Sequence, residues 1–477
     1  MYILIYLLFS LISYSNNIYA HPSKGIAHTG SLLYRSLLRS TSSYPNRLEQ
    51  RMTYKTLIPW LAKQKGYNTI SAEKAKGCYF WDEQDKKYID FTSGLMVVNL
   101  GHAREELKQC IISNLEKGLD YFPPSISTTN RELLAERLIE ISPIKDGKVF
   151  FSNGGADANE VALFISLEYH RIKGNPQKKR LLSFEKSFHG GSTYVASLMG
   201  GDTRKKFKLD AISANIESIL PNPISGEEYS SLTAITRIIE EEHENIAAIL
   251  LEGSSGSAGC YLYPKNYLET IREKARQHDI VFIDDEVMSA WGRAGNLFAV
   301  EKANLKYPPD IITTAKGLTN GCIPMGAVII SEEISSLFDN NPLLTGLTYS
   351  GHPLACTVAN TCLDLYLEDN QKIISQARRT GNYLKNKAQD LVAKHSSIKE
   401  LRIQGLLGCF ELKDHPQIVE ILATMQTQLK NLGVFIFARE RFLFLAPPLT
   451  IEAYQIDETL DLFSNALDFI DSTYYDI

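Results

Sequence analysis

The stretch IVFIDDEV, residues 280–287, decides the fold. It opens with four apolar residues that lack the alternation of a half-exposed strand, and it then runs into three acids. The earlier stretch IAAILLEG (246–253) has the same character, and a helical pattern over YLETIREKARQHD (267–279) separates the two. Continuous apolar strands that are separated by helices predict a mostly parallel sheet with helices on both faces.

The same order of elements extends in both directions along the chain. KVFFS (148–152) predicts a strand, and apolar residues at helical spacing from Ala158 to Tyr169 predict a buried helix after it. Downstream, DIITTAKG (310–317) and GAVIIS (326–331) predict two further strands. We therefore expect an α/β fold with this sheet at its centre.

The chain of 477 residues is too long for one compact core. An amphipathic helix pattern over 418–432 and two short strand patterns within 434–446 give its C-terminal end an α+β character. We expect a large domain over 104–371 and a smaller C-terminal domain over 372–477, which the N-terminal segment 52–103 joins.

Residues 1–51 form a leader with three possible explanations. The apolar run 2–12 is about half the length of a membrane-spanning helix and resembles the core of a signal peptide, with Ala20 as a weak cleavage site but no basic residue before it. Residues 1–48 contain no acid and combine arginines with serines, as transit peptides do. Alternatively, the functional chain begins near Met52. The compartment therefore stays open, and the core suits the cytoplasm or an organelle matrix.

The composition excludes several classes of protein. The net charge is −5, with 44% hydrophobic and 22% charged residues and no dense block of Lys and Arg, which argues against nucleic acid or a membrane surface as the main partner. No stable membrane insertion is expected. The seven cysteines are scattered without CxxC spacing, so neither a disulfide framework nor a metal site is expected.

Chemically distinctive residues follow four of the predicted strands. Gly155 and Ala156 come after the first, Glu252 after the second, Asp285 ends the third and Lys316 ends the fourth. Ligands of parallel α/β sheets bind at the carboxyl ends of the strands. A glycine turn at a helix start can bind phosphate, a buried carboxylate needs a partner, and a buried lysine can be a nucleophile.

Each of these features alone is more often structural: a turn, a capping acid or a solvated lysine. Their combination matches pyridoxal phosphate, which needs a lysine for a Schiff base, an aspartate on the pyridinium nitrogen and an anion site.

Five motifs in order carry a family resemblance: FFSNGGADANE (150–160), SFHGG (187–191), IDDEVMSAWGRAG (283–295), PDIITTAKGLTNGCIPMGAVI (309–329) and GLTYSGHPLAC (346–356). From about residue 55 to 470 the chain resembles the class-III (ω-amino acid) aminotransferases of pyridoxal-phosphate fold type I. Within that family it is most similar to the taurine–pyruvate and β-alanine–pyruvate branch.

The resemblance implies roles around the cofactor ring. Lys316 would bind the cofactor aldehyde and later carry the proton that moves during the reaction, and Asp285 would keep the ring nitrogen protonated. Val287 would pack on one face of the ring and Phe188 would stack on the other. His189 follows the stacking residue in its motif.

The resemblance also implies a phosphate site shared between two subunits. The backbone of Gly155 and Ala156 would bind the phosphate together with Thr348 from a second subunit, and Glu252 would support the surroundings of the ring. A homodimer or a dimer of dimers is therefore expected.

Substrate contacts are implied at Met96, where relatives often have an aromatic residue, and at Arg439 or Arg441, near a carboxylate-binding arginine of several relatives. The chain departs from the family pattern at Ala156, where many relatives have serine, and at Phe188, where tyrosine is usual. These departures bear on substrate and rate.

The expected activity is transfer of an amino group from an ω-amino acid or amine, such as taurine, β-alanine or a GABA-like donor, to pyruvate or a similar keto acid. The alternatives are an aminomutase or decarboxylase of the same fold, and a non-catalytic binding protein with this fold. A general interaction protein would bind no chromophore.

Overall fold

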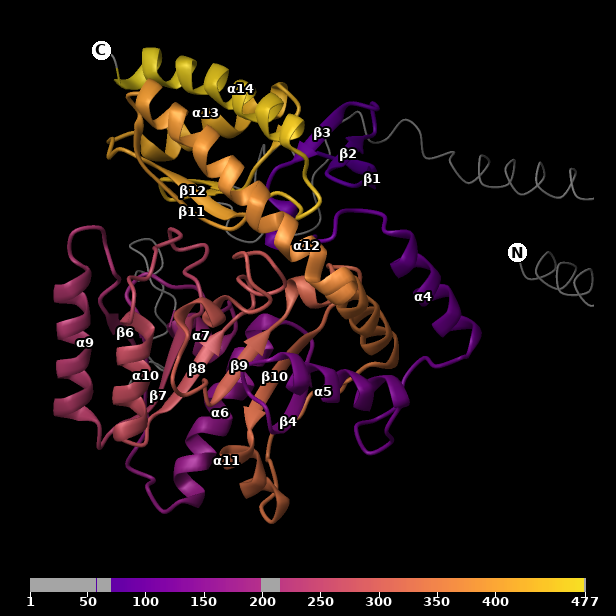
Figure 1. Ribbon diagram of the computed structural model, residues 1–477, viewed down its shortest axis with the longest axis vertical. Helices are drawn as coiled ribbons and strands as arrows, with labels where there is room; N and C mark the ends of the chain where they lie inside the picture. The colour runs from indigo at the N-terminus through magenta and orange to yellow at the C-terminus, as the bar shows by residue number, and fades with distance from the viewer. Residues whose placement is uncertain (1–56, 58–69, 199–214, 476–477) are drawn as a thin grey trace, which may run out of the picture. The chain divides into compact units, whose positions relative to one another are not determined.

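The computed structural model describes Leu57, residues 70–198 and residues 215–475 (Figure 1). The predicted leader, residues 1–51, lies outside the described part. The chain divides into two compact units, Met1–Ile70 and Ser71–Ile477, and the second contains all the elements below. Within the described residues, no helix combines the length and the apolar character that crossing a membrane requires.

A seven-stranded sheet forms the centre of the second unit, with the strand order β4-β10-β9-β8-β7-β5-β6. The strands are β4 (Gly147–Ser152), β5 (Arg180–Phe184), β6 (Ile216–Leu220), β7 (Ile246–Glu252), β8 (Val281–Asp285), β9 (Ile311–Thr314) and β10 (Gly326–Ser331). Strands β6, β5, β7, β8 and β9 pair in parallel, whereas β10 pairs antiparallel with both β9 and β4. The predicted mostly parallel sheet is confirmed.

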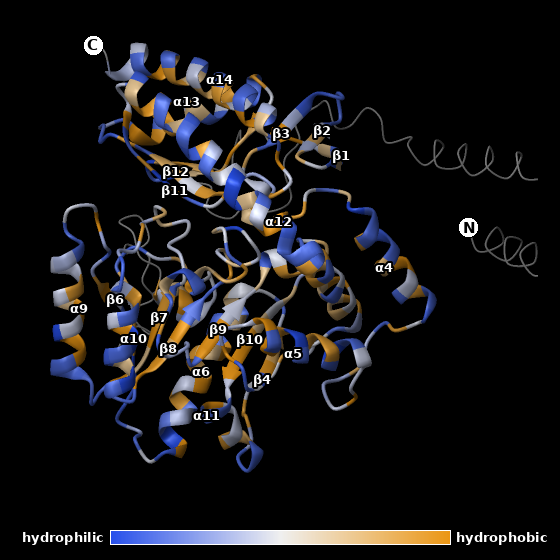
Figure 2. Cartoon of the chain, viewed as in Figure 1, coloured by the Kyte–Doolittle hydropathy of each residue, from blue (hydrophilic) through white to orange (hydrophobic). Residues whose placement is uncertain are grey.

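Helices cover both faces of this sheet, which explains why its central strands do not alternate. In β7 and β8, Leu250 and Ile283 pack in one cluster with α6 (Gly155–Ile172). Their neighbours Leu251 and Phe282 face the other way, into a cluster with α9 (Glu228–Glu242) and α10 (Tyr267–Gln277). Figure 2 shows the result as hydrophobic strands beside helices that also carry hydrophilic residues.

The remaining helices that accompany this sheet are shorter or lie at its ends. They are α4 (Glu105–Glu116), α5 (Thr129–Ile141), α7 (Thr193–Ser197), α11 (Glu332–Ser335) and the short turns η3 (Ala299–Ala303), η4 (Lys316–Thr319) and η5 (Ser336–Asp339). The long helix α12 (Pro353–Lys394) leads from here into the C-terminal part of the chain.

Two strands, β5 and β6, are absent from the sequence prediction above. Each has only five residues. Strand β6 lies at the edge of the sheet, where its residues alternate between buried and partly buried. Polar residues interrupt both segments, RLLSF and IESIL, so neither has the continuous apolar run that marks β7 and β8.

The C-terminal part contains a four-stranded antiparallel sheet in the order β11-β12-β15-β14. Its elements are β11 (Ile398–Gln404), β12 (Leu407–Leu412), α13 (Ile418–Asn431), β14 (Ala438–Arg439), β15 (Phe442–Leu445), α14 (Ala453–Ile470) and η6 (Asp471–Tyr475). The prediction of two strands within 434–446 is wrong in number, because the first pattern, VFIFA (434–438), is divided between two strands. The chain forms β13 (Val434–Phe435) in one sheet and then crosses to β14 in another.

Strand β13 completes a third sheet, which the N-terminal segment begins. Its other members are β1 (Ala72–Lys76), β2 (Tyr79–Asp82) and β3 (Lys87–Asp90), and β13 pairs in parallel with β3. The short helix α3 (Ser93–Met96) follows. The domain limits at residues 52, 104 and 372 stay predictions.

Candidate active site

A cavity of about 350 Å³ opens where β4, β7, β8 and β9 end. Eight of the predicted site residues line it: Gly155, Ala156, Phe188, His189, Glu252, Asp285, Val287 and Lys316. Met96, Thr348, Arg439 and Arg441 are not among the residues that line it. The structure therefore brings together, in one cavity, the residues that follow four separate strands.

Lys316 stands one residue beyond the end of β9, where it begins the turn η4. Its φ of 47° places it in the left-handed region, which non-glycine residues rarely adopt and which is frequent at functional sites. Its amine has no hydrogen bond or ion pair to any described residue. Burial lowers the pKa of Lys316 from its usual 10.5 to about 8, although the nearby acids Asp285 and Glu252 oppose the shift.

Asp285 is held as a carboxylate acceptor at the end of β8. Its Oδ1 accepts a hydrogen bond from the backbone N–H of Val287 at 2.9 Å. Its Oδ2 accepts from Asn159 Nδ2 at 2.8 Å and lies 2.7 Å from His189 Nδ1. Because a carboxylate only accepts, His189 carries its proton on Nδ1, and its Nε2 lies 2.8 Å from Ser183 Oγ.

Asn159 is a site residue that the sequence prediction missed. It lies on α6, where it also donates to the carbonyl of His189 at 2.8 Å and accepts from Thr313 Oγ1 at 2.6 Å. Asn159 thus fixes both Asp285 and His189. The available signal was a polar residue on the buried face of an apolar helix, where an amide needs partners.

The start of α6 provides an anion site. Residues 155–157 open a helix of 18 residues, and the first backbone N–H groups of any helix have no partner within it. A side chain at Gly155 would lie 2.5 Å from Val287 Cγ1, so only glycine allows the backbone to come this close. Exposed N–H groups and the helix dipole at this point suit a phosphate.

Glu252 lies buried at the end of β7, beside this set. Burial raises the pKa of its carboxyl group from 4.5 to about 7, and the neighbouring Asp285 raises it further, while His189 and Lys316 act in the opposite direction. The cavity thus contains an acid that is easily protonated near neutral pH.

Arg439 lies against the cavity wall. Its guanidinium carbon is 5.6 Å from the centre of the Phe188 ring, and its Nη1 donates to Ser257 Oγ at 3.4 Å. Both Phe188 and Ser257 line the cavity. Arg441, in contrast, forms an ion pair with Asp414.

The other two predicted residues lie outside the cavity. Met96 is buried behind its wall, in one apolar cluster with Met288, which does line the cavity. Thr348 accepts a hydrogen bond from Tyr121 Oη through its backbone carbonyl at 2.9 Å.

These residues fit pyridoxal phosphate. An unpartnered amine of lowered pKa, a carboxylate at the end of the next strand and an anion site at a helix start share one cavity, and these are the three groups that the cofactor needs. With the sheet topology, they define a pyridoxal-phosphate-dependent enzyme of fold type I.

Comparison with known proteins narrows this class. The model of the family Aminotransferase class-III matches residues 61–467. Gamma aminobutyrate transaminase 2 of Solanum lycopersicum is 33% identical, over 83% of this chain and 90% of its own length. Putrescine–pyruvate aminotransferase of Pseudomonas aeruginosa is 31% identical, over 85% and 91%. The chain belongs to the class-III aminotransferase family, whose members transfer amino groups with pyridoxal phosphate.

A solved structure agrees with this assignment. Taurine:2-oxoglutarate aminotransferase from Bifidobacterium kashiwanohense, in complex with PLP and glutamate, superposes with a TM-score of 0.78 at 28% identity, over 88% of this chain and 96% of that one.

Proposed function

We propose that this aminotransferase moves the amino group of an ω-amino acid or a primary amine to pyruvate or a similar keto acid. The observation that carries the proposal is the unpartnered amine of Lys316, which shares a cavity with Asp285. The similar proteins whose names mention GABA, putrescine with pyruvate, and taurine support this class of donor.

Three residues serve the reacting end of the cofactor. The bound cofactor supplies an electron sink for the carbon that bears the amino group. Lys316 Nζ would hold the cofactor aldehyde between reactions and would remove and return the proton on that carbon. Asp285, oriented by His189, would keep a proton on the ring nitrogen.

The phosphate end is shared between two copies of the chain. The N–H groups of Gly155 and Ala156 bind the phosphate, and Thr348 of the partner subunit completes the site. Support comes from large apolar side chains beside Thr348 that this chain leaves in solvent: Leu344 is 70% exposed and Tyr349 60%. Exposed apolar groups of this size mark interaction surfaces.

Arg439 is the residue that selects substrates with a carboxylate. Burial lowers the pKa of Arg439 to about 10, so it keeps its charge at neutral pH, and Glu440 Oε1 lies 4.0 Å from its Nε. Phe188 and Met288 supply apolar walls on the same side of the cavity, with Met96 behind Met288. Arg441 has no role in this proposal, since its guanidinium pairs with the exposed Asp414.

The first experiment tests the reaction with matched donors. The purified enzyme with pyridoxal phosphate is given β-alanine, taurine, GABA or putrescine, each with pyruvate or 2-oxoglutarate, and both products are measured. We expect equal amounts of new amino acid and of oxidised donor. Release of CO₂ from the donor would indicate a decarboxylase, and a bound cofactor that no donor changes would indicate a binding protein.

The same assay tests Arg439. We expect Arg439→Met to raise KM for β-alanine by about tenfold, as for loss of a charge-assisted hydrogen bond, and to leave putrescine unaffected. Arg439→Lys, which keeps the charge, is the matched control. An equal effect on both donors would remove Arg439 from substrate binding.

A further inference from the structure

Arg293 is a fully buried cation that binds two distant parts of the chain. Its Nη1 donates to the carbonyls of Leu406 at 2.9 Å and Pro447 at 2.5 Å. Its Nη2 donates to Ser93 Oγ at 3.0 Å and Asn99 Oδ1 at 2.8 Å. The guanidinium therefore joins the loop after β8 to the N-terminal segment and to the C-terminal part.

All four acceptors are neutral oxygens, and Arg293 forms no ion pair with any described residue. Burying an ion without a counter-ion costs several kcal/mol, and most buried charges are paired. Asp90 acts on Arg293 from a distance, and its carboxylate accepts from the backbone N–H of Gly94 and contacts His102. The buried guanidinium therefore has four neutral hydrogen-bond acceptors and no ion-pair partner among the described residues.

Asn99 connects Arg293 to the loop that bears Lys316. While its Oδ1 accepts from Arg293, its Nδ2 donates to the carbonyl of Trp291 at 3.2 Å. A side chain at Gly317 would lie 2.6 Å from the same Nδ2, so the backbone next to Lys316 packs directly on the Asn99 amide. One side chain thus separates the guanidinium from the peptide of Lys316.

The same contacts hold part of the cavity wall. Residues 93–99 include Val97, which lines the cavity, and a side chain at Gly321 would lie 2.7 Å from Val97 Cγ1. Movement of this segment would change both the wall and the support of the turn after Lys316.

We propose that Arg293 is a positioning residue for Lys316: its hydrogen bonds to Ser93 and Asn99 hold residues 93–99 against the loop that bears Lys316. This inference rests on the proposed role of Lys316.

The groups that face Lys316 act in both directions. Asp285 at the end of β8, with His189 bonded to it, and Glu252 at the end of β7 favour the ammonium form; the acids act against the lowered pKa of Lys316. Arg293 acts in the direction of the lowered pKa. Tyr366 of α12, the other titratable neighbour of the loop, donates its hydroxyl proton to the carbonyl of Gly317 at 2.8 Å. Movement of residues 93–99 away from this loop would expose the Lys316 amine to water and raise its pKa.

The test measures the amine itself, in enzyme freed of cofactor. Acetylation of Lys316 by acetic anhydride is followed by mass spectrometry from pH 6 to 11 in wild type, Arg293→Met and Arg293→Lys. We expect half-maximal reactivity of the wild type near pH 8 and of Arg293→Lys close to it. Arg293→Met should shift the midpoint upward by about one unit, which lowers the rate at pH 7 about tenfold.

A purely structural role gives a different result. Arg293→Met would then lower the thermal stability while the midpoint of Lys316 stays at the wild-type pH, and the inference would be overturned. If Arg293→Met does not fold, Asn99→Leu takes its place, because it removes the amide that links the guanidinium to the Lys316 loop and adds no charge; its midpoint must also move upward, and an unchanged midpoint overturns the inference.

The outcome for the proposed function is separate. A wild-type midpoint near 10.5 together with no visible absorption band on adding pyridoxal phosphate would contradict the role of Lys316. A midpoint near 8 that no variant moves contradicts only the role of Arg293.

Discussion

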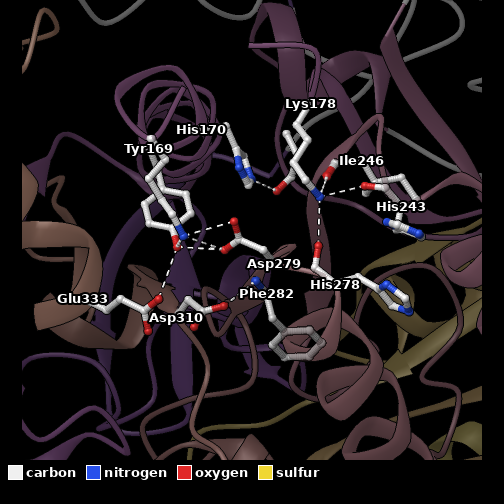
Figure 3. A network of polar contacts seen from close by, with 12 residues as sticks. Tyr169, His170, Lys178, His243, Ile246, His278, Asp279, Phe282, Asp310 and Glu333 are labelled. Carbon is white, nitrogen blue, oxygen red and sulfur yellow. Dashed lines mark hydrogen bonds and ion pairs between the residues drawn. The ribbon is translucent and has the colours of Figure 1, made fainter. Parts of the chain in front are cut away.

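Two buried lysines lie at opposite ends of the parallel strands of the seven-stranded sheet, and burial lowers the pKa of both. We call the amino-terminal ends of these strands the amino edge and the carboxyl-terminal ends the carboxyl edge. At the amino edge, before β5, Lys178 Nζ donates to three backbone carbonyls, those of His243 at 2.7 Å, Ile246 at 3.3 Å and His278 at 2.9 Å (Figure 3). At the carboxyl edge, the amine of Lys316 has no described partner. The two buried lysines therefore differ in their partners: the amine of Lys178 is bonded three times, and that of Lys316 stays available to a ligand.

Lys178 sits where the chain needs a cation. His243 and His278 are the C-terminal caps of α9 and α10, and the last carbonyls of a helix lack partners and carry partial negative charge. One ammonium group thus satisfies two helix ends and the start of β7.

The acids and phenols near Lys178 are also paired. Tyr169 Oη lies 2.9 Å from Asp279 Oδ1 and 3.2 Å from Glu333 Oε1, within hydrogen-bond distance of both carboxylates (Figure 3). Arg272 binds both carboxylate oxygens of Asp310, at 3.0 and 2.7 Å. At the amino edge the charged side chains form ion pairs and hydrogen bonds with one another. In the cavity at the carboxyl edge, the amine of Lys316 stays available to a ligand.

The largest effect should come from removing the available amine. Lys316→Ala should lower the rate of transamination by about 10²–10⁴-fold, since it removes the group that moves the proton. Its melting temperature should stay near that of the wild type, because the amine has no partner to lose. Rates with β-alanine and pyruvate, beside a thermal unfolding curve, measure both. Wild-type activity in Lys316→Ala would contradict the claim that the amine at the carboxyl edge takes part in the reaction.

Removing the paired lysine should do the reverse. Lys178→Met removes the donor from three backbone carbonyls and leaves none in its place, so it should lower the free energy of unfolding by about 2–5 kcal/mol. The activity of the folded enzyme should not change. The matched control is Lys179→Met, because Lys179 is the exposed neighbour. Equal denaturation midpoints for the two variants would show that Lys178 is not a structural cation.

The residues of the cavity at the carboxyl edge could be predicted from the sequence, because their pattern is distinctive. Charged residues at the ends of continuous apolar runs, as at Asp285 and Lys316, must meet at one edge of a parallel sheet. The amino edge could not be predicted. Lys178 lies in a run of polar residues and looks like any solvated lysine, and its acceptors are backbone carbonyls 65 to 100 residues away.

Contacts between side chains that are far apart in the sequence could not be predicted either, because each partner lies in another segment. Asn159 reaches Asp285 across 126 positions, and Arg293 reaches Pro447 across 154. The pattern of one segment does not determine which amide or carbonyl from another segment it meets. Even the course of the chain from β13 to β14 depends on which sheet offers a free edge, and 434–438 alone carries no sign of it.

The smallest effect concerns a titration at the amino edge. His170 is fully buried on α6; its Nε2 lies 2.9 Å from the carbonyl of Ala247 and its Nδ1 has no hydrogen-bond partner in the described structure. Burial lowers the pKa of His170, so the folded protein keeps it neutral. The unfolded chain, with a histidine pKa of about 6.5, takes up the proton more readily, so stability is lost as the pH falls below about 6.5.

His170→Gln keeps an N–H donor for the carbonyl of Ala247 but cannot titrate. Between pH 7 and pH 5, the free energy of unfolding of the wild type should fall more steeply than that of the variant, by up to about 1.4 kcal/mol per pH unit. Urea denaturation at several pH values measures the two slopes, and the other titrating groups cancel in the difference. Parallel slopes would mean that His170 is protonated in the folded protein, where its Nδ1 would need an acceptor. A steeper loss of stability in the wild type would instead show that His170 is neutral in the folded protein and that its neutral form stabilises the amino edge of the sheet.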